Sequence, residues 1–280
     1  RRHTNFSMES IEQTFNGTPD FGKSISATIS RNGDLIYRMY LEHQVYLSPP
    51  SSSAGFDHLH IGCDYGSHVM KQYELEIGGQ MIDRHYGHWH SVYSQLNESN
   101  PTGGGEAPNA QGANVTGDTL FNRMSGNGFG FEGGTPYFDS GSGLTKYRGW
   151  TKTNPNAGDQ GGEYKRINGR FWIPLYFWFC RNPGLALPLI ALQYHEVKVN
   201  ITLEDIAQLV VISQRGHGEV VGDGHALATN ETSGSGGTGV IDSTHSHGLP
   251  AKLFQLWVDY IYLDTDERRR FAQVSHEYLI

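Results

Sequence analysis

The chain has 280 residues, a formal net charge of −8 and 36 glycines. This length is sufficient for one large all-β domain or two smaller domains with a sizeable core. The negative net charge argues against a surface built to neutralise nucleic-acid phosphates. No apolar stretch of the sequence is long enough to span a bilayer, because Pro174, Arg181 and Pro183 interrupt the one candidate. The two cysteines, Cys63 and Cys180, do not make a disulfide framework.

Apolar and polar residues alternate with a period of two in several stretches, which predicts β-strands. Residues 24–30 and 196–203 each place apolar side chains on one face and polar side chains on the other. This pattern is typical of a sheet that is packed on one side only. Residues 253–263 are apolar or aromatic on both faces, which favours a central strand.

Glycine and proline predict where these strands turn or end. The Asn-Gly pair within residues 31–34 predicts a tight hairpin turn of the primed type, and Gly78-Gly79 predicts another. Residues 171–180 form an apolar run that we interpret as a strand. Pro174 within this run favours an edge position or a bulge, because proline donates no hydrogen bond to a neighbouring strand.

Two short segments have helical patterns. Four apolar residues are spaced i, i+3, i+4 and i+7 and form one stripe: Trp89, Val92, Tyr93 and Leu96. A second short helix is predicted to begin near Asp264, because Glu267 follows it at the spacing of a capping box.

Glycine is concentrated in two long stretches of the chain that lack the alternation of the predicted strands. Residues 97–169 contain 17 of the 36 glycines and residues 213–248 contain 9, and both ranges are rich in Ser, Thr and Asn. Neither range has a sustained period, so we interpret both as surface excursions from one domain. About eight short strands with two large excursions predict an all-β fold, an eight-stranded jelly-roll β-sandwich with one or two short helices.

The histidines are the most plausible candidates for a metal site. A metal-binding cupin holds its ion through a His-x-His pair and a following Glu, and His88-Trp-His90 supplies such a pair, with His85 nearby. However, the next glutamate is Glu98, and Ile82 stands where the pattern requires glycine. We therefore predict no metal site and no cofactor.

No catalytic residue is predicted either. His195 and Glu196 are neighbours on a predicted strand, so their side chains point to opposite faces and do not converge on one substrate. Cys180 is interpreted as a small buried apolar residue.

Sites for N-linked glycan are more frequent than chance predicts. The chain contains six Asn-x-Ser/Thr triplets, whereas its composition predicts roughly two. Three of them fall in the two long loops, at Asn97, Asn114 and Asn230. These three asparagines are the candidates for glycosylation.

Several blocks of sequence resemble one protein family along nearly the whole chain. The chain is similar to the major capsid proteins of large icosahedral DNA viruses, most closely to those of phycodnaviruses of the chlorovirus type. The blocks that carry the resemblance are residues 1–17, 29–36, 74–85, 170–198, 257–264 and 270–280.

The resemblance implies a structural protein and not an enzyme. Residues 1–280 would be the first barrel of a double jelly roll, truncated at both ends, without the N-terminal arm and the second barrel of the family. Three copies would close into a pseudo-hexagonal capsomer of the virion's capsid shell, in contact with neighbouring capsomers and minor capsid proteins. Neither direct contact with nucleic acid nor a membrane span is expected.

Two alternative functions remain open at this point. One is a jelly-roll metalloenzyme of the cupin type, which the missing Glu and Gly disfavour. The other is a carbohydrate-binding sandwich, which three aromatic residues of the first long loop suggest: Tyr137, Tyr147 and Trp150.

Overall fold

The computed structural model describes most of the predicted strands and part of the two long loops. The described residues are 5–47, 56–61, 64–98, 120–126, 148–151, 167–214, 225–227, 229–232, 239–241 and 252–273. The strands are β1 (Phe6–Gln13), β2 (Phe15–Asn16), β3 (Ser24–Thr28), β4 (Leu35–Leu47), β5 (Phe56–Ile61), β6 (Met70–Ile77), β7 (Gln80–Tyr86), β8 (Arg148–Thr151), β9 (Ile167–Pro174), β10 (Leu187–Pro188), β11 (Val197–Leu203), β12 (Val210–Gln214), β13 (His225–Leu227), β14 (Thr229–Thr232), β15 (Gly239–Ile241) and β16 (Lys252–Leu263).

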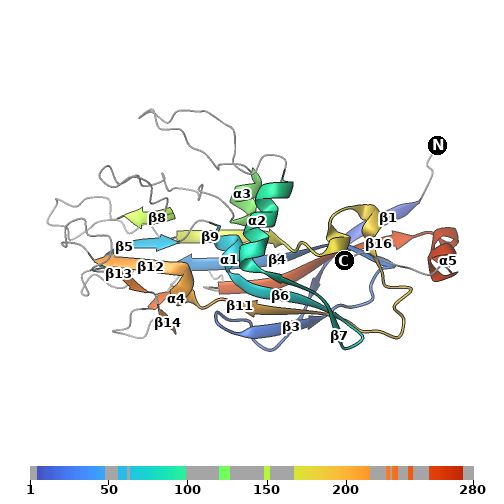
Figure 1. The fold of residues 1–280 in the computed structure, drawn as a ribbon, viewed down its shortest axis with the longest axis horizontal. Helices are drawn as coiled ribbons and strands as arrows, with labels where there is room; N and C mark the ends of the chain where they lie inside the picture. The colour runs from blue at the N-terminus through green and yellow to red at the C-terminus, as the bar shows by residue number, and fades with distance from the viewer. Residues whose placement is uncertain are drawn as a thin grey trace.

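Short helices lie between these strands and after the last of them (Figure 1). They are α1 (Tyr65–His68), α2 (Gly87–Asn97), α3 (Leu120–Ser125), α4 (Ile206–Leu209) and α5 (Thr265–Gln273), with two short 3-10 helices, η2 (Trp178–Cys180) and η3 (Pro183–Leu185). In the described part of the chain, none of the helices is long and apolar enough to cross a membrane.

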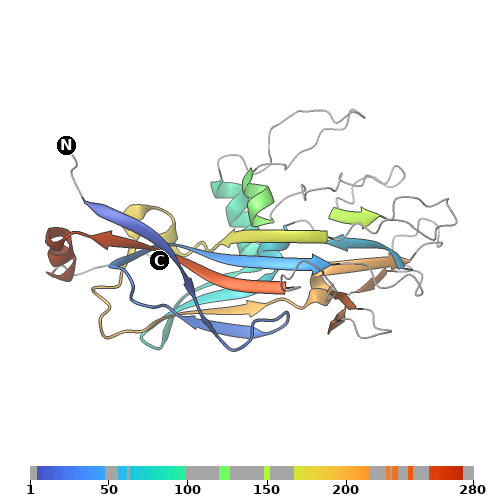
Figure 2. The same ribbon diagram turned by 180° about the vertical axis from the view of Figure 1, so that it is seen from behind.

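Eight of the strands form the two sheets of a sandwich. Sheet one has the order β1-β16-β4-β9 and sheet two has the order β3-β11-β6-β7, with antiparallel neighbours throughout. Numbered from one to eight along the chain, these strands run 1-8-3-6 in one sheet and 2-7-4-5 in the other. This is the order of a jelly roll, and it confirms the predicted eight-stranded sandwich. Figure 2 shows the strands of sheet one side by side.

The core lies between the two sheets and follows from the alternation in the sequence. Along β11, each residue from Val197 to Leu203 is alternately buried and half-buried, and β3 repeats the pattern. The predicted central strand is β16, which pairs with β1 on one side and β4 on the other. Large aromatic side chains fill the centre, among them Tyr73, Phe171 and Tyr260.

A third, smaller sheet was not predicted from the sequence. It has the order β13-β12-β5-β8 and lies at one end of the sandwich, on the left in Figure 1. β8 comes from the excursion 97–169 and β13 from the excursion 213–248, so described segments of both excursions belong to one sheet. The parallel pair of β14 and β15 adjoins sheet one, where Ile241 pairs with Leu47.

The turn predicted at residues 31–34 is not a hairpin. It connects β3 of sheet two with β4 of sheet one, and these two strands do not pair with each other. Gly33 does not have a positive φ; it is required because a Cβ atom there would lie 2.7 Å from the Cβ of Tyr260. By contrast, Gly78 and Gly79 have φ values of 61° and 82° and form the predicted two-residue turn between β6 and β7.

The apolar run 171–180 is a strand only as far as Pro174. β9 ends there and pairs with β4 alone among the described strands, so the proline ends an edge strand. The chain then continues through an extended segment into η2. The strand prediction was wrong beyond Pro174 because an apolar run without alternation does not distinguish a strand from other buried structure.

Both predicted helices are present, as α2 and α5. Asp264 caps α5: its Oδ1 accepts a hydrogen bond of 3.0 Å from the backbone N–H of Glu267. The shorter helices α1, α3 and α4 were not predicted. They have four to six residues each, which is too short for a helical period to be recognised.

Candidate functional site

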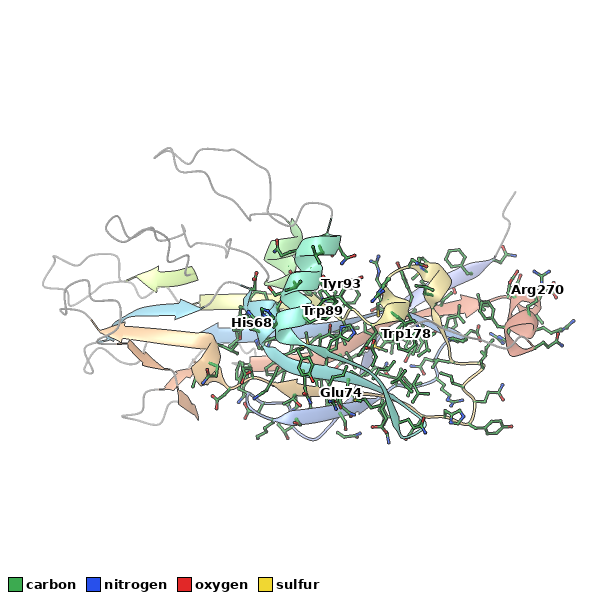
Figure 3. All side chains as sticks on the ribbon, in the orientation of Figure 1. His68, Glu74, Trp89, Tyr93, Trp178 and Arg270 are labelled. Carbon is green, nitrogen blue, oxygen red and sulfur yellow. The ribbon has the colours of Figure 1, made fainter. Side chains whose placement is uncertain are left out.

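Helix α2 buries its polar face, whereas an ordinary surface helix buries its apolar face. It buries Gly87, His90 and Ser94, whereas three of the four apolar residues of the predicted stripe are exposed and the fourth, Tyr93, is half-buried. The side chains of Trp89, Val92 and Leu96 are 42%, 38% and 74% exposed. Periodicity therefore located the helix correctly but did not reveal which face is buried. Figure 3 labels Trp89 and Tyr93 on this helix.

The polar face of α2 is buried because His90 connects three elements. Its Nε2–H donates a 2.7 Å hydrogen bond to the carbonyl oxygen of Pro174, at the end of β9. Its Nδ1 then accepts a 2.8 Å hydrogen bond from the hydroxyl of Ser67 in α1. Burial lowers the pKa of His90 from 6.5 to about 4, so the ring is neutral at pH 7.

His43 forms a second buried connection of the same kind. Its Nδ1–H donates to the carbonyl oxygen of Leu253 at 3.0 Å, and its Nε2 accepts from the hydroxyl of Tyr65 at 2.9 Å. Burial lowers its pKa from 6.5 to about 4. The ring also stacks on Phe254, with the centroids 4.2 Å apart. Both buried histidines thus join segments that are far apart in the sequence.

The geometry does not fit a cupin-type metal site. His88 is exposed, and both ring nitrogens of His90 are occupied by protein groups. His85 is bonded on both sides as well, by the carboxylate of Asp83 at 3.1 Å and the hydroxyl of Tyr73 at 3.3 Å. Within the described residues, no three His, Cys, Asp or Glu side chains form a group that would hold a metal ion.

A cavity of about 580 Å³ lies beside α2. α2, α3, β4, β9 and η2 all contribute to its wall. Most of the side chains that line it are aromatic, basic or sulfur-containing, including Arg38, Met39, Tyr40, Tyr93, Phe121, Met124, Trp172, Tyr176, Cys180 and Arg181. These residues lie on separate strands and helices, so no local motif of the sequence identified them.

Two arginines, Arg38 and Arg181, line this cavity, and the carboxylate of Asp259 lies close enough to Arg38 to interact with its charge. The guanidinium of Arg181 lies 5.5 Å from the centre of the Tyr93 ring, and Arg38 donates a 3.3 Å hydrogen bond to the hydroxyl of Tyr40. The one carboxylate among the lining residues, Glu98, accepts a 3.4 Å hydrogen bond from the hydroxyl of Tyr176. Among the lining residues, two are therefore basic and one is acidic.

The thiol of Cys180 also lines the cavity. Cys180 is partly buried, and burial raises the pKa of its thiol, so it is not an activated nucleophile. Cys63 lies outside the described residues.

The outer faces of the two sheets have different chemistry. The outer face of sheet two is polar on three of its strands, with Ser24, Ser26 and Thr28 on β3, Lys198, Asn200 and Thr202 on β11, and Gln72, Glu74 and Glu76 on β6. The edge strand β7 adds two large exposed side chains, Met81 and Tyr86. Such small polar and charged side chains are typical of a face in contact with solvent.

Sheet one carries aromatic side chains on its outer face. Trp172, Trp257 and Tyr40 alternate with residues that point into the core. Glu42 lies among them, 1% exposed, and accepts hydrogen bonds from Arg170 at 2.5 Å and from Trp257 at 2.7 Å. This carboxylate connects three neighbouring strands. Tryptophan, tyrosine and arginine are the side chains that are enriched at protein–protein interfaces.

The candidate glycosylation sites are described only in part. Asn97 is not in a loop but is the last residue of α2; it is exposed, and its Nδ2 donates a 3.0 Å hydrogen bond to the carbonyl oxygen of Tyr93. Asn230 belongs to β14, and its side chain is not described. Asn114 lies outside the described residues, as do Tyr137 and Tyr147.

Comparison with known proteins identifies a family for this chain. A family model described as "Major capsid protein N-terminus" matches residues 1–264. The major capsid protein of Pyramimonas orientalis virus is 40% identical over 280 residues, which cover 100% of this chain and 50% of that protein. The major capsid protein of Paramecium bursaria Chlorella virus 1 is 35% identical over 280 residues, which cover 100% of this chain and 45% of that protein.

Solved structures agree with this result. A chain of the quasi-atomic model of the PBCV-1 virus capsid matches with a TM-score of 0.57 and 30% identity, over 99% of this chain and 47% of that chain. The Faustovirus major capsid protein matches with a TM-score of 0.55 over 97% of this chain and 57% of that chain; at 13% identity, this similarity shows the fold alone. The chain spans about half the length of the relatives it matches. Because the family model covers residues 1–264, the chain belongs to the major capsid protein family of large DNA viruses.

Proposed function

We propose that this chain is the first jelly-roll barrel of a structural protein that builds the capsid shell of a large icosahedral DNA virus. One observation carries the proposal: the eight-stranded order of the sandwich coincides with a family match over residues 1–264. The protein acts by shape and contact and not by catalysis. Its place is the shell of the virion.

The assembly unit of this shell is a homotrimer. A second barrel follows the first, so that three chains present six barrels and form a pseudo-hexagonal capsomer. Neighbouring capsomers and minor capsid proteins are the further partners. The net charge of −8 and the absence of a basic patch motif in the sequence support partners other than nucleic acid.

Within this unit, residues 97–169 and 213–248 are excursions of the first barrel, and they crown its outer end. The pairing of β8 with β5, and of β5 with β12, supports this arrangement because it joins segments near the same end of the sandwich. Asn97, Asn114 and Asn230 are the proposed glycan attachment sites. Asn97 is the best supported of the three, since it is exposed at the end of a helix.

The experiment is a mass measurement on the full-length protein. Size-exclusion chromatography with light scattering over a wide range of concentrations is expected to give three times the mass of one chain. Quantitative mass spectrometry of purified particles is expected to rank the protein among their most abundant components. A protein that stays monomeric at high concentration and is scarce in particles contradicts the proposal.

A further inference from the structure

Helix α2 is attached to the barrel mainly by polar contacts. An ordinary surface helix buries its apolar stripe, and this burial is the main force that holds it in place. In α2, Trp89, Val92 and Leu96 are exposed, so they contribute little to its attachment. The helix crosses the direction of the strands, with α1 and α3 beside it (Figure 1). Its position therefore depends on the few side chains that point toward the barrel.

Two of these polar contacts meet at the ring of His90. Its Nε2–H donates a 2.7 Å hydrogen bond to the carbonyl oxygen of Pro174, and its Nδ1 accepts one of 2.8 Å from the hydroxyl of Ser67. The next residue, Ser91, donates a 2.9 Å hydrogen bond to the carboxylate of Asp64, directly before α1. His90 thus joins α2 to α1 and to the end of β9 at the same time.

The start of α2 is packed so closely that His90 has no contact with water. A Cβ atom at Gly87 would lie 2.6 Å from the carbonyl oxygen of Met70 and 2.7 Å from that of Ser67. The residues His90 and Ser67 are both 0% exposed. A proton added to the ring of His90 would therefore be a charge in the protein interior, which is costly unless an opposite charge accompanies it.

The described contacts of the His90 ring include no carboxylate. The titratable and charged side chains on the surrounding elements are Asp64 and His68 at α1, Tyr73 on β6, Asp83 and His85 on β7, Tyr176 and Arg181 after β9, and His88, Tyr93 and Glu98 on or directly after α2. The three carboxylates among them are hydrogen-bonded to other side chains, Asp64 to Ser91, Asp83 to His85 and Glu98 to Tyr176.

The neighbours of His90 do not compensate for its burial. Burial is the main reason that the pKa of His90 falls from 6.5 to about 4, and the charges of His85 and His68 act in the same direction. The hydrogen bond to Pro174 opposes this effect only in part. In an open conformation with α2 detached, the ring is in water and binds a proton more tightly. The open conformation is therefore favoured as the pH falls from 6.5 toward 4.

We propose that protonation of His90 releases α2 from the barrel, so that this helix opens in acid while the sandwich remains folded. A protonated Nδ1 no longer accepts the hydrogen bond from Ser67. Release exposes little additional apolar surface, because the large apolar residues of α2 are exposed already. The apolar core of the described residues includes no residue of α2, so the two sheets keep their packing.

Release of α2 also changes the cavity of about 580 Å³ beside it. Tyr93, Asn97 and Glu98 form the part of the cavity wall that α2 and its last turn contribute. When the helix detaches, these three side chains leave the wall, and the cavity opens on this side. Acid therefore uncovers Tyr176 and Trp172, which line the same cavity. This response belongs to the single barrel and does not depend on its assembly into a shell.

Hydrogen exchange of the full-length protein at pH 7 and pH 5, followed by mass spectrometry, measures the opening of α2. With a pKa of 6.5 for the open form and about 4 for the closed form, the opening constant is expected to rise roughly twentyfold between these pH values. The amides of residues 91–97 are expected to lose protection by this factor after correction for the intrinsic effect of pH. The amides of β11, in the core, are expected to remain better protected than those of α2 at both pH values.

Three variants separate the role of His90 from that of other histidines. His90→Gln is expected to lose the roughly twentyfold rise, which a purely structural role of His90 does not predict. His43→Gln is the matched control, because His43 is equally buried and has the same lowered pKa, but bonds to Leu253 and Tyr65 and not to α2. His88→Gln changes an exposed residue of the same helix. Both controls are expected to keep the rise.

Three results would overturn the proposal. One is a wild type in which residues 91–97 are as protected at pH 5 as at pH 7. Another is a rise that persists in His90→Gln. The third is a loss of protection in α2 and β11 together, which reports unfolding of the whole barrel. The first and third are measured on the wild type alone, so they decide the matter even if His90→Gln does not fold.

Discussion

Acid is expected to destabilise the barrel through its buried histidines, and His90 is the one that is best placed for a test. The ring is fully buried and uses both nitrogens, one toward Pro174 and one toward Ser67. Its pKa is about 4 in the folded protein and 6.5 in the unfolded chain. The unfolded state therefore binds more protons between these two values, and stability falls as the pH drops through this window.

The magnitude follows from the two pKa values. With 6.5 in the unfolded chain and about 4 in the folded protein, His90 alone makes the protein roughly 2 kcal/mol less stable at pH 5 than at pH 7. Below about pH 4 the loss levels off, because both states are then protonated. His43 has the same pair of values and adds a loss of the same size.

The assay is urea unfolding followed by tryptophan fluorescence, at several pH values between 7 and 5. His90→Gln removes the titrating group and keeps one donor and one acceptor. At pH 7 this variant is expected to be less stable by roughly 1–3 kcal/mol, since amide geometry does not satisfy both buried partners. Between pH 7 and pH 5, the free energy of unfolding of this variant is expected to fall by roughly 2 kcal/mol less than that of the wild type.

His88→Gln is the matched control, because His88 is exposed on the same helix. It is expected to leave both the stability and its pH dependence as in the wild type. A His90→Gln variant with the pH dependence of the wild type, or a larger change in His88→Gln, would contradict this prediction.

Three further changes test other parts of the fold. Gly33→Ala places a Cβ atom 2.7 Å from the Cβ of Tyr260, and we expect a loss of roughly 1–3 kcal/mol in the free energy of unfolding; a variant as stable as the wild type contradicts this crowding. Asp34→Asn removes an ion pair with Arg268 (3.0 Å) and weakens a hydrogen bond from the N–H of Leu263 (2.8 Å). We therefore expect the amides of α5 to exchange hydrogen faster; unchanged exchange would contradict a role of Asp34 in holding α5. Asn97→Gln is expected to remove one glycan from the protein made in its host, which the mass of the peptide 97–99 reports; an unmodified wild-type peptide excludes this site.

Alternating strands were the most predictable part of the structure. Residues 24–28 and 197–203 each bury every second side chain, and the alternation of apolar and polar residues in the sequence predicts this burial pattern. The turn at Gly78-Gly79 was predictable for a similar local reason, since its positive φ values need glycine.

Features that depend on distant partners were not predictable. Gly33 has the sequence context of a hairpin, yet its function is to make room for Tyr260, which is 227 positions further along the chain. The burial of the polar face of α2 depends on two distant residues. The carbonyl oxygen of Pro174 accepts a hydrogen bond from His90, and the hydroxyl of Ser67 donates one to it. Periodicity reports that a stripe exists, but not which side is covered by the remaining structure.

The cavity beside α2 illustrates the same limit for the candidate site. Arg38, Trp172 and Arg181 lie on β4, β9 and the segment after η2, and the sandwich brings them together. No spacing in the sequence relates them. The two histidines of the His-x-His pair also differ in their surroundings, because His88 is exposed and His90 is buried although both lie on one helix.

Electron cryo-microscopy of the purified virus particle tests the central claim most directly. We predict that the shell contains the sandwich of residues 1–264 in every capsomer, with sheets in the order β1-β16-β4-β9 and β3-β11-β6-β7 and three copies around each local threefold axis. A shell built from another protein, or capsomers in which this sandwich is absent, would contradict the account.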